Sequence, residues 1–194
     1  MPRYFHFDVT LVLSRRVWRS FLIHKQASFH ELHLAIQDAF GWQNYHLFQF
    51  QHPADSRRVI AGIPDDEFGE YIPDAKRVKL VDKTFSSSVP VWFEYEYDFG
   101  DGWRHEVKLR GDVSLPDKFK RRLLDGERAA PPEDAGGESG YDRLLTVFEK
   151  NVDAYDDDLE NVKSWMGDWN PDRFDLAKAK ARFDLGVKTR PKLN

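Results

Sequence analysis

The chain has 194 residues, of which 41% are hydrophobic and 14% aromatic, and it carries a formal net charge of −4. A chain of this length and composition is expected to form one domain with a hydrophobic core, with or without an appendage. The absence of cysteine excludes disulfide bonds, thiol nucleophiles and cysteine-ligated zinc. No segment is apolar enough to span a bilayer and no apolar leader follows Met1, so we expect a cytoplasmic protein without membrane contact.

The first fifty residues predict three strands around one helix. Apolar and polar residues alternate over residues 5–13, which is typical of a half-buried strand. Residues 17–24 predict a second strand, antiparallel to the first, and residues 45–51 predict a third. Three side chains are expected on one face of this third strand: His46, Phe48 and Phe50.

A capping box marks the start of the helix between the second and third strands. Ser28 can accept a hydrogen bond from the helix while Glu31 reaches back, and the apolar stripe continues to about Phe40, before Gly41. Two strands, a helix and a further strand form a β-grasp-like order (ββαβ). We therefore predict an α+β fold with a mixed, mostly antiparallel sheet, packed helices and a C-terminal helical segment.

The rest of the chain alternates between irregular and helical predictions. Residues 52–76 are polar and rich in Pro, Gly and Asp, which predicts a long excursion over the surface. Residues 126–141 contain two prolines and several glycines, which predicts an ordered loop without regular structure, followed by a helix that begins at Tyr141. We expect one α+β domain over residues 1–194, with a helical part at residues 141–185 packed on it and a basic tail at residues 186–194.

The segment VWFEYEYDFGDGWRHEVKLR, residues 91–110, predicts the central hairpin and holds the densest group of Asp, His and Trp. A two-residue turn at Asp101-Gly102 would place Asp98 opposite His105. A three-residue loop at residues 100–102, with its last glycine in the left-handed conformation, instead aligns two rows of mainly aromatic and apolar side chains, and we adopt it. The pairs expected on this face are Phe99–Trp103, Tyr97–His105, Tyr95–Val107 and Phe93–Leu109.

Three motifs carry a family resemblance. They are the segment from Leu32-His33 through IQDAFGWQNYHLFQF to Phe50, YDFGDGWRHEV at residues 97–107, and GERAAPPEDAGGESGY at residues 126–141. With a weaker match, WNPDRFDL at residues 169–176, they resemble the plasmid pRiA4b ORF-three-like proteins over most of the chain. The resemblance implies a single α+β domain of a kind that occurs on plasmids, mobile elements and chromosomes of bacteria and archaea, and it implies no particular biochemical role.

The chain also departs from the pattern of the proteins it resembles. Such proteins often carry a second histidine at the position of Phe48, and cysteines near Leu123 and at Ala130 and Ala135. This chain lacks those ligand groups, so the resemblance does not imply a zinc site here.

Polar side chains of the hairpin and of the Pro-Gly segment form the candidate site. The predicted ligand-binding residues are Asp98, Asp101, Trp103, His105, Glu133, Asp134, Tyr141 and His46, and His33 could join them. Carboxylates with histidine suit a divalent metal or a general acid–base pair. Each also has a structural explanation, such as a pair with Arg104 for Asp98, turn formation for Asp101 and a core hydrogen bond for His105. No catalytic residue and no metal ligand set is assigned.

Two classes of function remain open. The first is a binding or accessory module for nucleic acid or protein, with little to indicate an enzyme. Its candidate contacts are the basic residues Lys118, Lys120, Arg121 and Arg122, which otherwise form a solvated face, and the tryptophans Trp18, Trp42, Trp92 and Trp103. The alternative is a metal-dependent hydrolase or small-ligand-binding protein that uses the Asp/His/Glu cleft. A divalent metal is the one cofactor this pattern suggests.

Overall fold

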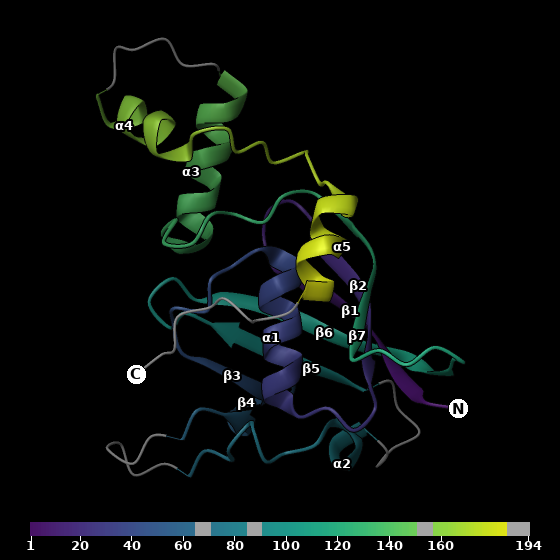
Figure 1. Ribbon diagram of the computed structural model, residues 1–194. Coiled ribbons are helices and arrows are strands. Elements are labelled where there is room, and N and C mark those ends of the chain that lie inside the picture. The colour runs from purple at the N-terminus through teal and green to yellow at the C-terminus, as the bar shows by residue number, and fades with distance from the viewer. Residues whose placement is uncertain (65–70, 85–90, 151–156, 186–194) are drawn as a thin grey trace.

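The computed structural model describes residues 1–64, 71–84, 91–150 and 157–185. Seven strands form one sheet in the order β4-β3-β5-β6-β1-β2-β7, and neighbouring strands are antiparallel throughout (Figure 1). The strands are β1 (Arg3–Leu11), β2 (Val17–His24), β3 (Phe48–His52), β4 (Asp55–Gly62), β5 (Trp92–Tyr97), β6 (Trp103–Ser114) and β7 (Arg121–Glu127). The helices are α1 (Phe29–Phe40), α2 (Leu80–Thr84), α3 (Gly137–Lys150), α4 (Asp157–Met166) and α5 (Leu176–Leu185). The predicted α+β class and ββαβ order are therefore confirmed.

The N-terminal predictions agree closely with the structure. β1 and β2 pair antiparallel, with Phe7 opposite Phe21. Both halves of the capping box form, because Ser28 accepts from the Glu31 backbone and Glu31 accepts from the Ser28 backbone. Gly41 ends α1 in the left-handed conformation, with φ of 92°.

The core lies between one face of the sheet and two helices, α1 and α5, which pack side by side (Figure 1). β1 illustrates how one face of the sheet joins the core: its inward side chains are fully buried, whereas alternate ones such as His6 and Asp8 stay partly exposed. The buried side chains of β1 on this face are Phe5, Phe7, Val9 and Leu11. Burial of each such side chain contributes about 1.5–3 kcal/mol. α3 and α4 pack on each other beyond the edge of this layer.

The central hairpin forms, but its predicted register is wrong by two residues. Tyr97 pairs with Trp103 and Tyr95 with His105, so the loop spans five residues instead of three. Asp98 causes the difference, because it adopts a left-handed φ of 58° and its carbonyl accepts the Gly102 N–H at 2.6 Å. A shift of two residues leaves every strand side chain on its predicted face. Phe99, expected in the aromatic row, is instead 50% exposed in the loop.

Three further boundaries differ from prediction. The predicted surface excursion contains β4, and β3 begins at Phe48, so His46 lies in the preceding loop. The Pro-Gly segment is regular at both ends, because Gly126 and Glu127 belong to β7 and α3 begins at Gly137. Gly136 and Gly137 adopt positive φ values, of 86° and 67°, where the loop turns into α3. The predicted basic tail, residues 186–194, lies outside the described residues.

None of the described helices combines the length and the apolar character that a membrane crossing requires.

Candidate functional site

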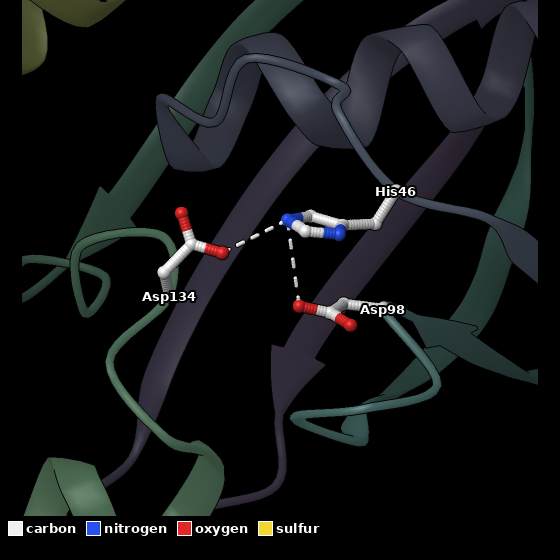
Figure 2. A group of neighbouring side chains, drawn as sticks. All are labelled: His46, Asp98 and Asp134. Atoms are coloured by element: carbon white, nitrogen blue, oxygen red, sulfur yellow. Dashed lines mark hydrogen bonds and ion pairs between the residues drawn. The ribbon is translucent and has the colours of Figure 1, made fainter.

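Three loops bring one histidine and two carboxylates together (Figure 2). His46 precedes β3, Asp98 follows β5, and Asp134 precedes α3. The His46 Nε2 atom lies 3.0 Å from Asp134 Oδ1 and 3.5 Å from Asp98 Oδ2. One ligand atom from each residue lies within 4.8 Å of the other two, an arrangement that can hold a metal ion. Among the described residues, no other group of three His, Asp or Glu side chains meets this geometry.

The turn that Asp98 begins orients its carboxylate. Its Oδ1 atom accepts the backbone N–H of Gly100 at 3.0 Å and of Asp101 at 3.4 Å, which leaves Oδ2 facing His46. Its own N–H donates to the Leu47 carbonyl at 2.9 Å, so the loops of Asp98 and His46 are joined by backbone as well. Only 12% of the Asp98 side chain is exposed, so the cluster is shielded from solvent on the side of Asp98.

Glycines allow the Asp134 loop to approach the hairpin turn. The Gly136 N–H donates to Asp101 Oδ2 at 3.0 Å. A Cβ atom on Gly137 would lie 2.4 Å from the Asp101 carbonyl oxygen, and one on Gly140 would lie 1.6 Å from the Ala135 carbonyl oxygen. A side chain at Gly137 would therefore push the Asp134 loop away from the hairpin turn, and a side chain at Gly140 would distort the Asp134 loop where it folds back on α3.

Glu133 ties the same segment to the loop that carries His46. Its carboxylate accepts the Gln43 N–H at 2.7 Å and the Tyr97 hydroxyl at 2.5 Å. The Tyr97 hydroxyl in turn accepts the Tyr45 N–H at 3.0 Å. Burial, and then the hydrogen bond to Glu133, raise the pKa of Tyr97 well above its ordinary value, so the phenol stays protonated and donates to the carboxylate.

A buried polar network holds Asn44, two residues before His46, in place. His33 lies between the Tyr95 hydroxyl, 2.8 Å from its Nδ1, and the Asn44 side-chain oxygen, 2.6 Å from its Nε2. Gln37 donates to Tyr95 at 3.0 Å and accepts the Asn44 N–H at 3.1 Å. His33 is fully buried and stacks on Phe48, so it is a positioning residue of the core and not a member of the cluster.

Three other predicted site residues lie in the core. His105 is fully buried beside Phe40 and Trp42, and burial lowers its pKa to about 3. Its Nδ1 lies 3.2 Å from the Trp103 carbonyl oxygen, so that nitrogen carries the proton and donates. Trp103 is 2% exposed, and Tyr141 is fully buried. Trp103 and His105 keep the face of β6 that the sequence predicts for them, and that face is covered by the core, so neither side chain reaches Asp98.

The remaining candidates take separate places. The Asp101 carboxylate accepts the Gly136 N–H, so it bonds to the Asp134 loop without entering the cluster. Of the basic residues, Arg121 pairs with Asp38 and donates to the Phe183 carbonyl, whereas Lys118 and Lys120 are exposed. Arg122 covers the ring of Phe119 at 4.0 Å. Trp42 is buried, and Trp18 and Trp92 are half-buried.

All three residues of the cluster were predicted, but two of the residues that position them were not. Asn44, like Asp98 and Asp134, has a positive φ, of 62°. Tyr97 was assigned to the aromatic layer alone, without its bond to Glu133. Asn and Asp tolerate this conformation better than other residues, so their presence in these loops was the available signal.

Comparison with known proteins found matches over part or most of this chain. A family model described as plasmid pRiA4b ORF-3-like protein matches residues 3–178. The chain is 37% identical over 117 residues to an uncharacterized protein, y4hQ, of Sinorhizobium fredii, a match that covers 60% of this chain and 58% of that protein. A crystal structure of a protein of unknown function, MM3350 from Methanosarcina mazei Go1, is similar with a TM-score of 0.77 at 28% identity, over 92% of this chain and 98% of that one. The chain therefore belongs to the plasmid pRiA4b ORF-3-like protein family.

Proposed function

We propose that this protein is a divalent-cation-dependent binding protein, with the cation held by His46, Asp98 and Asp134. The observation that carries the proposal is the convergence of three ligand atoms from three separate loops. Metal-dependent hydrolysis, the alternative predicted from the sequence, would use the same ligands and stays a prediction.

Hydrogen bonding alone does not account well for this convergence. The Nε2 atom of His46 has one N–H, which one carboxylate can accept, yet two carboxylate oxygens approach it at 3.0 and 3.5 Å. Two carboxylates so close together repel each other, and a divalent cation between them would remove that repulsion.

The donor set indicates the kind of cation. One imidazole nitrogen with two carboxylate oxygens suits Mn²⁺ or Zn²⁺ better than a soft metal that prefers thiolates. Three protein ligands leave coordination positions open for water or for a bound molecule. With 67% of its side chain exposed, Asp134 leaves the site open to solvent on one side.

Titration with a metal tests the proposal. Protein stripped with EDTA is melted with increasing Mn²⁺ or Zn²⁺, and binding to the folded state alone should raise the melting temperature. At a hundredfold excess over the dissociation constant the stabilisation is about 2.7 kcal/mol. Asp98→Asn and Asp134→Asn should each abolish the shift.

A second His–Asp pair supplies the matched control. His6 and Asp8 lie 3.6 Å apart on the open face of the sheet, and the described structure groups no third ligand with them. Asp8→Asn should keep the full metal-induced shift. A wild-type protein that neither ion stabilises would refute the proposal, as would equal losses in Asp8→Asn and Asp98→Asn.

Binding to nucleic acid through Lys118, Lys120, Arg121 and Arg122 remains a prediction from the sequence. The pairing of Arg121 with Asp38 leaves this patch less charged than its sequence suggests. An affinity for DNA or RNA that falls steeply with salt would support it, and an affinity that ignores salt would not.

A further inference from the structure

A cavity of about 430 Å³ opens beside the cluster, between α3 and α4. Its volume lies in the range of roughly 300–1,000 Å³ that is typical of small-molecule sites. Asp134 lines this cavity and also belongs to the cluster, so a cation bound there would lie at the cavity wall.

The cavity combines polar groups with an apolar wall. Ser139 and Arg143 of α3 supply a hydroxyl and a guanidinium, and the first turn of α3 begins at this end. A guanidinium presents paired N–H donors that match a phosphate, and the positive end of a helix favours the same charge. Leu144, Val162 and Trp165 form the apolar part, and Trp165 is 51% exposed.

These features define a ligand with two parts. Anionic oxygens would complete the coordination of a cation at Asp134 and accept from Arg143. A flat ring would cover the exposed indole of Trp165, as bases cover aromatic side chains in single-strand binding proteins. Both walls belong to one cavity, so a single ligand can carry both parts.

We propose, on the basis of the proposed cation site, that this cavity binds an aromatic organic phosphate such as a nucleoside monophosphate. The phosphate bridges the cation and Arg143, and the ring stacks on Trp165. Asp134 is the link, because it lines the cavity and carries a ligand oxygen of the cluster.

Calorimetric titration with adenosine monophosphate tests the proposal on the full chain, with Mn²⁺ and then with EDTA. We expect binding with Mn²⁺ and at least a tenfold weaker affinity with EDTA. Arg143→Gln and Trp165→Ala should each lower the affinity by roughly tenfold. Arg104→Gln, an exposed arginine on the open face of the sheet, is the matched control and should change nothing.

Binding of Mn²⁺ is measured separately, from the paramagnetic resonance signal of free Mn²⁺. Both cavity variants should bind Mn²⁺ as the wild type does, which also shows that they fold. If Mn²⁺ binds and adenosine monophosphate does not, the cavity proposal is overturned while the cation site stands. The same holds if neither variant weakens the binding of adenosine monophosphate. If Mn²⁺ does not bind the wild type, the proposed function itself fails. Adenosine or inorganic phosphate binding as tightly as the monophosphate would overturn the two-part ligand.

Discussion

Replacement of His105 by Phe should change how the stability of this protein depends on pH. His105 is fully buried between aromatic rings, and burial lowers its pKa from 6.5 to about 3. In the unfolded chain the imidazole takes up a proton below about pH 6.5, whereas in the folded chain it stays neutral down to about pH 3. Proton uptake therefore favours the unfolded state, and stability is lost as the pH falls through this window.

The size of the effect follows from the two pKa values. Each pH unit well inside the window lowers the free energy of unfolding by about 1.4 kcal/mol through this one group. Between pH 7 and pH 5 the loss amounts to about 2 kcal/mol, because the window opens only near pH 6.5. His105→Phe removes the titrating group and keeps a planar ring among Phe40, Trp42 and Tyr95.

Urea denaturation followed by tryptophan fluorescence, at several pH values, measures the effect. The relevant quantity is the wild-type free energy of unfolding minus that of the variant, in which the other titrating groups cancel. We expect this difference to be constant above pH 7 and to fall by about 2 kcal/mol by pH 5, in favour of the variant. A difference that does not vary with pH would refute the burial of a neutral imidazole. His105→Gln should show the same pH dependence if Phe does not fit.

Three further substitutions test the supports of the fold and the site. Arg19→Met should lower the free energy of unfolding by about 3 kcal/mol or more, measured in urea, because four backbone carbonyl groups lose a buried charged donor. Gly137→Ala should destabilise more than Gly167→Ala and should also weaken Mn²⁺ binding; both glycines have positive φ, but only at Gly137 would the new Cβ meet backbone, at 2.4 Å. Tyr97→Phe should cost about 1–3 kcal/mol in a thermal melt, because Glu133 and a backbone N–H lose their shared partner, and a cost near zero would contradict this role.

Local signals predicted the N-terminal half of the fold well. Alternation along β1, the capping box at Ser28 and the left-handed Gly41 each depend on neighbours within a few residues, and each is found. The hairpin register failed because it depends on the conformation of one non-glycine residue. Asp98 adopts a positive φ that its sequence permits but does not require, and the loop gains two residues.

The sequence predicted a candidate site of eight named residues, and the structure brings three of them together. These three are His46, Asp98 and Asp134, whereas His105 and Trp103 lie on the buried face of β6. Adjacent residues on a strand point to opposite faces, and those two alternate residues share the core side. Their nearness to Asp98 along the chain therefore did not make them part of the cluster.

The sequence by itself determined the fold class, the helix boundaries of α1 and the family, because these depend on local periodicity and on motifs that stay contiguous. Only the tertiary structure decided which polar residues meet. His46 and Asp134 are 88 positions apart in the sequence. Their contact depends on Gly137, because a glycine there allows α3 to approach the turn at Asp101. Packing between segments that are distant in the sequence determines this approach, and no local pattern in the amino-acid sequence predicts it.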